Sequence, residues 1–222
     1  MGSSEVKPVV TLAALYGAGG SVIGPRVAER LGVPFLDREI PDAVAQRTGL
    51  SREAVAVLDE GPRSGSERLI SRLGRAAPAS GASGDAGQDL DLQEQRLRGH
   101  AEEFLARAGV SGGVALGRGG MVVLRDVPHA LHVLLRGPRE ARVRQGMAIE
   151  GVDRESAERR QEAEDQARIE YVRRAYGLDG ENPGMYHLTL DSTALDHDAC
   201  VELIVTASKA RMRDPRPPSP SE

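Results

Sequence analysis

The sequence has 222 residues, 40% of them hydrophobic, and a formal net charge of −4. This length fits one large domain or two small ones, since about 150 residues is a usual domain size. The small negative charge does not favour non-specific nucleic-acid binding, and the single cysteine excludes an internal disulfide. No segment approaches the roughly 20 apolar residues that span a membrane, and the N-terminus lacks a signal-peptide pattern, so we expect a cytoplasmic protein.

The start of the chain predicts a strand, a glycine turn and a helix in direct succession. Residues 9–15 form a short apolar run that is typical of a buried strand, and they lead into the glycine-rich turn 16–21. Residues 22–31 have helical spacing and end at a glycine. Residues 33–36 predict a second short strand, and the carboxylate of Asp37 can cap the helix that we expect next.

The rest of the chain alternates between the two kinds of element. Residues 76–89 are small and polar and cannot bury enough apolar area to offset the entropy of ordering, so we expect a mobile insertion. Helical spacing returns over 90–108. Later strands are predicted over 114–116, 130–135 and 186–190, and helices over 138–150, 154–175 and 199–210. We expect one domain over 1–210 and a disordered Pro/Ser tail over 211–222.

This alternation predicts the fold class. Strands that are separated by helices pair in parallel through crossover connections. Aromatic residues make up only 3% of the chain, so the core must consist of Val, Leu, Ile and Ala, which suits a sheet covered by helices. We therefore expect an α/β domain with a doubly wound, mainly parallel sheet that is flanked by helices.

The turn after the first strand has the composition of a phosphate-binding loop. Glycines let backbone N–H groups converge on an anion, and the helix that follows presents its positive end. The residues that we expect to bind a nucleotide are Gly17, Ala18, Gly19, Gly20 and Ser21. A glycine turn that binds no ligand is an alternative that the turn alone leaves equally open.

The loop departs from the full pattern Gly-x-x-x-x-Gly-Lys-Ser/Thr at two positions. With Gly19 as the second glycine, Ala14 stands at the first glycine and Gly20 at the lysine that would reach the β- and γ-phosphates. Ser21 keeps the hydroxyl that would bind a metal ion. Pro25 would collide with a preceding carbonyl of the helix, so we expect the helix to start late or to bend there.

Residues 16–40 resemble the opening of the cytidylate-kinase-like family, in which the phosphate loop also lacks the lysine. The family usually has an arginine where this chain has Ser21 and a basic residue where it has Pro25. The resemblance continues, in order, through the segments 117–120, 131–138, 165–177 and 182–192 and spans roughly residues 9 to 208. It implies a P-loop kinase-like fold with a helical lid. Authentic cytidylate kinases carry Gly-Arg-Asp where this chain has Gly119 in place of the Asp that helps to recognise the cytosine ribonucleotide.

The resemblance also implies an activity and a set of site residues. The activity is transfer of the γ-phosphoryl group of ATP, with Mg²⁺, to CMP or a related nucleotide. Arg168 and Arg173 match the lid arginines, which makes them the expected catalytic residues, and Asp37, Arg38 and Arg118 are the expected substrate-binding residues. Arginine suits these roles because its planar fork binds phosphate oxygens in pairs.

Each of these residues also has a structural interpretation. Arg168 lies among acidic residues with which it can pair on a helix surface, and Arg118 can brace a loop. Asp37 can serve only as a helix cap, and Arg38 can be an ordinary surface arginine. The missing lysine adds a second functional hypothesis, which is a catalytically weak nucleotide-binding or regulatory protein that retains the kinase fold. The histidines share no metal-ligand spacing, and His132 and His187 fall within strand patterns, where we expect structural roles.

Overall fold

A computed structural model describes residues 6–36, 99, 102–103, 105–117 and 119–215 of the chain. Three expected substrate-binding residues lie outside these ranges, namely Asp37, Arg38 and Arg118. The expected insertion at 76–89 and the last residues of the expected tail lie outside them as well. The statements that follow concern the described residues.

A parallel four-stranded sheet forms the centre of the described structure, in the order β2-β1-β3-β4. Its strands are β1 (Val9–Ala14), β2 (Gly113–Leu116), β3 (Leu131–Arg136) and β4 (Leu188–Asp191). The chain places β2 on one side of β1 and then β3 and β4 on the other. Ligands of such open sheets bind at the carboxyl ends of the strands, where the strand order reverses, so the end of β1 is the expected place for a site.

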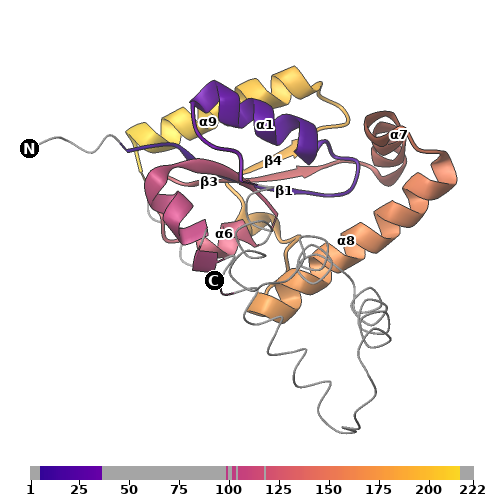
Figure 1. The fold of residues 1–222 in the computed structure, drawn as a ribbon, viewed down its shortest axis with the longest axis horizontal. Coiled ribbons are helices and arrows are strands. Elements are labelled where there is room, and N and C mark those ends of the chain that lie inside the picture. The colour runs from indigo at the N-terminus through magenta and orange to yellow at the C-terminus, as the bar shows by residue number, and fades with distance from the viewer. Residues whose placement is uncertain (1–5, 37–98, 100–101, 104, 118, 216–222) are drawn as a thin grey trace, which may run out of the picture.

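Helices cover both faces of this sheet (Figure 1). They are α1 (Gly20–Leu31), α6 (Gly120–Val123), α7 (Arg139–Glu150), α8 (Arg154–Tyr176) and α9 (His197–Arg213), with a short 3-10 helix, η1 (Pro183–Met185). Helices α1 and α9 lie side by side on one face, and α6 and α8 lie on the other (Figure 1). This arrangement is the predicted doubly wound α/β fold, and α8 is the helix expected as the lid.

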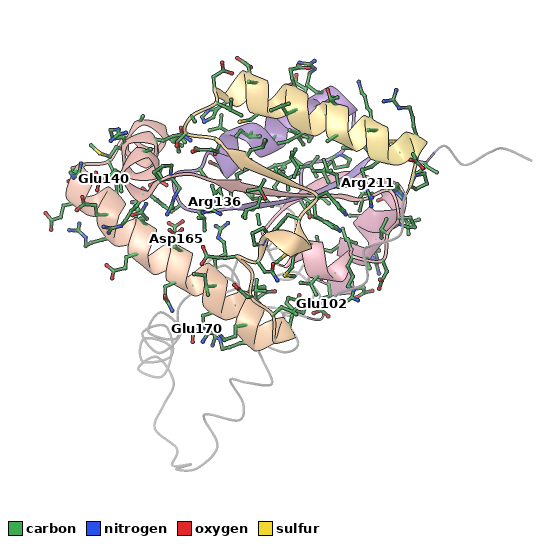
Figure 2. All side chains as sticks on the ribbon, turned by 180° about the vertical axis from the view of Figure 1, so that it is seen from behind. Glu102, Arg136, Glu140, Asp165, Glu170 and Arg211 are labelled. Carbon is green, nitrogen blue, oxygen red and sulfur yellow. The ribbon has the colours of Figure 1, made fainter. Side chains whose placement is uncertain are left out.

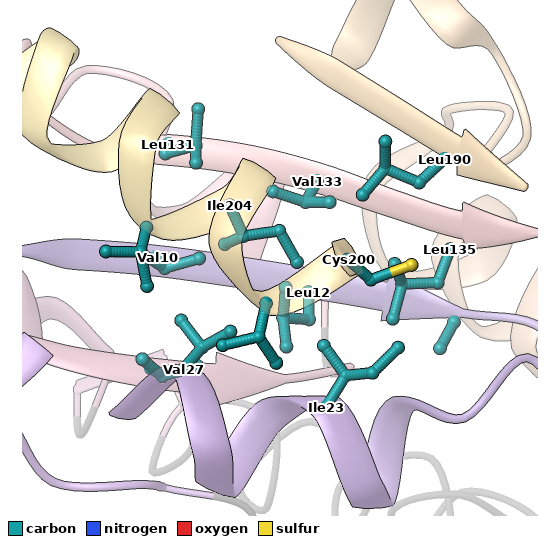
Figure 3. Close-up of a cluster of buried hydrophobic side chains, with 14 of the residues drawn as sticks. Val10, Leu12, Ile23, Val27, Leu131, Val133, Leu135, Leu190, Cys200 and Ile204 are labelled. Atoms are coloured by element: carbon teal, nitrogen blue, oxygen red, sulfur yellow. The ribbon is translucent and has the colours of Figure 1, made fainter. Parts of the chain in front are cut away.

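The main core lies between the sheet and the α1–α9 layer (Figure 3). Leu12 of β1 and Leu135 of β3 pack there against Ile23 of α1 and Ile204 of α9, and all four are at most 1% exposed. Cys200 also lies in this cluster as a free thiol. A smaller cluster on the other face includes Met121, Leu134, Val172 and Tyr186. Because both faces of the sheet are covered by apolar side chains, the strand sequences are almost continuously hydrophobic.

The structure corrects three sequence-based expectations. The predicted strand at 33–36 is only an isolated bridge between Phe35 and Val114, which is consistent with Pro34 having no N–H group for a ladder. The first helix begins at Gly20 and includes Pro25, which excludes the late start, one of the two outcomes expected there. Helix α9 runs to Arg213, so the disordered tail predicted from residue 211 is wrong for the first residues of that range.

None of the helices among the described residues combines the length and the apolar character that crossing a bilayer requires.

Candidate functional site

The loop between β1 and α1 has the backbone of an anion-binding turn. Gly17 and Gly19 have φ angles of 69° and 75°, a region in which glycine is strongly favoured. The loop is also packed closely, since a Cβ added to Gly17 would lie 2.0 Å from the carbonyl oxygen of Arg142. Both the conformation and the packing therefore require glycine at position 17.

Several N–H groups of this loop have no hydrogen-bond partner among the residues that the structure describes. The N–H of Ala18 donates to the carbonyl of Leu15, and those of Val22 and Ile23 donate to the carbonyl of Gly19. Within the described part of the chain, no hydrogen-bond partner exists for the N–H groups of Gly17, Gly19, Gly20 and Ser21. The last three belong to the start of α1, where the helix dipole is positive, so the loop offers unpaired donors to an anion.

The structure explains why the lysine position holds a glycine. A Cβ on Gly20 would lie 2.6 Å from the Cβ of Ala14 and 3.0 Å from Cδ1 of Leu116. The methyl group of Ala14 therefore occupies the space into which a side chain at position 20 would begin. Ala14 itself stands where the standard pattern has its first glycine. The two departures from the pattern are thus sterically coupled.

An ion pair holds the start of the loop. The N–H of Tyr16 donates to Oδ1 of Asp165 at 2.8 Å, and Nη1 of Arg142 donates to the carbonyl oxygen of Tyr16 at 2.8 Å. Nη1 of Arg142 also lies 2.8 Å from Oδ2 of Asp165, and the two side chains are only 8% and 19% exposed. Asp165 lies on the side of α8 that faces the sheet (Figure 2). The loop is therefore tied to both α7 and α8.

A mainly apolar cleft opens beside the loop, between the carboxyl end of β1, the β2–α6 turn and α8. Its lining includes Ala14, Leu15, Gly119, Gly120, Arg168 and Tyr186. Nη1 of Arg168 is buried there and has no hydrogen-bond partner among the described residues. Nor does Arg168 form an ion pair within them, whereas Glu170 pairs with Arg174 and Asp165 with Arg142. A guanidinium with no acidic partner among the described residues is suited to an anionic ligand.

The two expected lid arginines do not point into one place. Arg168 lines the cleft, whereas Arg173 is exposed to solvent. Residues five apart on a helix are about 140° apart around its axis, which accounts for the separation. Ser21 is exposed at the first turn of α1, so its hydroxyl is accessible to a ligand.

Comparison with known proteins identifies the family of this chain. The cytidylate kinase-like family matches residues 9–194. The chain belongs to this family. It is 24% identical over 208 residues to the cytidylate kinase of Methanopyrus kandleri, across 91% of this chain and 94% of that relative. Family membership brings a P-loop kinase-like fold.

Solved structures show the same fold. An uncharacterized protein from Eubacterium ventriosum has a TM-score of 0.63 at 16% identity, over 92% of this chain and 100% of that one. TT1252 from Thermus thermophilus has a TM-score of 0.51 at 17% identity, over 92% of this chain and 98% of that one.

Two further side chains lie against the loop, and neither was predicted from the sequence. A Cβ on Gly19 would lie 2.7 Å from Nε2 of His197 and 3.3 Å from Nε2 of Gln145. Both nitrogen atoms are buried and have no hydrogen-bond partner in the described structure. His197 begins α9 and Gln145 lies in α7, so only the tertiary fold brings them to the loop. No local sequence signal could have identified them.

The turn after β2 packs against the last residue of α8. Gly119 has a φ of 64°, and a Cβ there would lie 2.4 Å from Cε2 of Tyr176. The Tyr176 ring therefore takes the place that a side chain at position 119 would need. Burial is the main cause that raises the pKa of Tyr176, so its hydroxyl stays protonated.

Proposed function

We propose that this family member is a nucleoside monophosphate kinase, which transfers the γ-phosphoryl group of ATP to CMP or a related nucleotide. The observation that carries the proposal is the group of unpaired donors beside β1. The N–H groups at 17 and 19–21 and the buried Nη1 of Arg168 lack partners within the described residues. Phosphoryl transfer depends mainly on such donors being fixed around the transferring group.

The residues have distinct roles in this proposal. The loop N–H groups bind the phosphates of ATP, and Arg168 supplies the positive charge that the absent lysine would bring. The Ser21 hydroxyl is accessible, and oxygen ligands suit Mg²⁺, so Ser21 fits a magnesium ion that is shared with the phosphates. When bound, the ion would neutralise charge on the β- and γ-phosphates. No cluster of His, Cys, Asp and Glu that could hold a metal occurs among the described residues.

The acceptor nucleotide would bind in the cleft next to Arg168. Donor and acceptor must lie in line across the transferring group, so the acceptor belongs near the loop but outside it. We assign acceptor binding to Asp37, Arg38 and Arg118, and we assign closure over the phosphates to Arg173 along with Arg168. CMP is the proposed acceptor because the Methanopyrus kandleri relative is named a cytidylate kinase.

A catalytically weak nucleotide-binding protein is the second candidate. The observation that favours it is the packing at Gly20, because Ala14 leaves no room for a lysine side chain there. Such a protein would bind ATP without forming ADP. A regulatory role through the nucleotide-bound state would then replace turnover.

A coupled assay for ADP formation separates the two candidates. ATP and Mg²⁺ are supplied with each nucleoside monophosphate in turn, and we expect the fastest turnover with CMP. Arg168→Ala should lower kcat by about 100-fold, which is typical for losing one donor to a transition-state charge. Arg159→Ala is the matched control, since Arg159 lies on the same helix, is 61% exposed and pairs only with nearby side chains. Binding of ATP without ADP from any acceptor would support the second candidate instead.

A further inference from the structure

We infer that the Arg142–Asp165 ion pair is a positioning device that fixes α8 to the phosphate loop and thereby sets where the Arg168 guanidinium lies. The inference rests on the proposed function in one respect, which is the role given to Arg168. Neither Arg142 nor Asp165 is given contact with a substrate. Both are positioning residues.

The pair holds the backbone on both sides of Tyr16. Asp165 accepts the Tyr16 N–H through one carboxylate oxygen, and Arg142 donates to the Tyr16 carbonyl. Hydrogen bonds to charged groups are about twice as strong as neutral ones, and this pair is largely shielded from water. The next residue is Gly17, the first of the loop residues with an unpaired N–H group. The pair therefore fixes the point from which the anion-binding turn begins.

Arg142 is itself immobilised. Its Nε donates to the carbonyl of Gly137 at 3.1 Å, just after β3. Its Nη1 donates to the carbonyl oxygen of Tyr16 and to Oδ2 of Asp165. Its own backbone carbonyl packs against Gly17 so closely that an added Cβ would lie 2.0 Å away. Helix α7 and the end of β3 thus provide a rigid base for the ion pair.

The fixed position of the Asp165 carboxylate also sets where Arg168 lies on α8. The two residues lie about one helical turn apart and therefore share one face of α8. A helix is stiff over one turn, so a fixed Asp165 carboxylate determines both the rotation and the height of α8 at Arg168. Three other polar contacts join α8 to α7 in the described structure. Gln161 donates to the Arg139 carbonyl, Arg160 pairs with Glu150, and Arg154 pairs with Glu140. Among these residues of α8, only Asp165 touches the loop backbone.

The alternative is that the pair merely stabilises the fold. Breaking a buried ion pair leaves one charge without compensation, so a loss of stability is expected on either interpretation. The two interpretations differ in whether the effect on turnover passes through Arg168. A double-mutant cycle isolates that coupling.

The cycle compares wild type, Asp165→Asn, Arg168→Ala and the double variant by kcat, by KM for ATP and by Tm. We expect Asp165→Asn to lower kcat about 10-fold or more when Arg168 is present and less than about 2-fold when it is absent. The fall in Tm should be the same in both backgrounds. Glu158→Gln is the matched control, because it converts a carboxylate of the same helix that is 38% exposed and pairs with Arg154 four residues earlier. It should leave kcat unchanged.

Asp165→Glu keeps the charge and lengthens the side chain by one methylene, so it serves if Asp165→Asn fails to fold. It should lower kcat with little change in Tm, because charge is retained and geometry is not. An equal loss of kcat in both Arg168 backgrounds, or an unchanged kcat in Asp165→Glu and Asp165→Asn, would overturn the inference.

Amide hydrogen exchange tests the device without any turnover. In Asp165→Asn or Asp165→Glu, peptides that cover 15–21 and 165–172 should exchange faster than in Glu158→Gln, and unchanged exchange would overturn the inference. A wild type that forms no ADP from any acceptor would refute the proposed function, while the exchange result would still decide the role of the ion pair.

Discussion

The coupling between Ala14 and Gly20 predicts that the missing lysine cannot simply be restored. In Gly20→Lys, the new Cβ would meet the Ala14 methyl at 2.6 Å, whereas ordinary contacts of this kind are 3.4–4 Å. Overpacking of this size costs about 1–3 kcal/mol, and a lysine in a helix recovers at most about 1 kcal/mol relative to glycine. We expect a net loss of about 1–2 kcal/mol, which lowers Tm by about 3–6 °C in a chain of this size.

Removing the Ala14 methyl should relieve the collision. Ala14→Gly alone should cost about 1 kcal/mol, from the lost buried methyl group and the freer backbone. The double variant should then be more stable than the sum of the two single changes predicts, by about 1–2 kcal/mol. Thermal and urea unfolding of the four proteins provide the measurement. A Gly20→Lys variant as stable as wild type, or a strictly additive double variant, would refute the steric argument.

Two other predictions concern a buried histidine and a loop glycine. Burial and the nearby His187 and Arg211 lower the pKa of His132 to about 3, so the folded state disfavours its protonated form. Stability should therefore be complete above pH about 6.5 and fall as the pH drops towards 3, by about 3 kcal/mol at pH 4.5 from this group. Urea unfolding between pH 7 and 4.5 should show a shallower loss in His132→Asn than in wild type, and equal slopes would contradict the assignment. Gly17→Ala should abolish ATP binding and lower Tm more than Gly151→Ala. Both glycines have positive φ, but an added Cβ would lie 2.0 Å from a carbonyl oxygen at Gly17 and would meet nothing within 4 Å at Gly151. Similar losses of Tm in the two variants, measured by calorimetry, would show that the close packing is relieved elsewhere.

The parts of the fold that local sequence determines were predicted well. The succession of strand, glycine turn and helix at 9–31 depends on neighbouring residues, and the structure has β1, the loop and α1 in that order. The predicted start of α8 at 154 is confirmed, whereas α9 begins at 197 and not at the predicted 199. In the structure Asp153 and Asp196 cap these helices by accepting an N–H three residues later. The spacing of apolar residues was sufficient to predict the doubly wound α/β fold class.

The predicted boundaries of helices and strands were wrong near two prolines, Pro25 and Pro34. Pro25 removes a hydrogen bond from α1, yet the helix continues because Ile23 and Val27 on the same helix are fully buried in the core. Packing against β1 and α9 outweighs the local cost there. Pro34 has the opposite outcome, since residues 33–36 form a single bridge to β2 and not a strand.

The loop and Arg168 were the parts of the candidate site that the sequence predicted, the loop from its motif and Arg168 from the family resemblance. Gly17 to Ser21 form a contiguous motif, whereas Arg142 meets Asp165 from another helix and His197 reaches Gly19 from the end of the chain. Such contacts depend on the strand order β2-β1-β3-β4, which places the starts of α7 and α9 beside the loop. A single sequence carries no local signal for them.

We propose that backbone N–H groups and the Arg168 guanidinium bind a polyphosphate without a lysine. Isothermal titration calorimetry of the wild type and Arg168→Lys with Mg·ATP is the sharpest test of this binding mode. We expect saturable binding by the wild type and weaker binding by Arg168→Lys, because an ammonium group cannot replace the planar fork of donors. An absence of binding heat in the wild type, or equal affinity in both proteins, would contradict it.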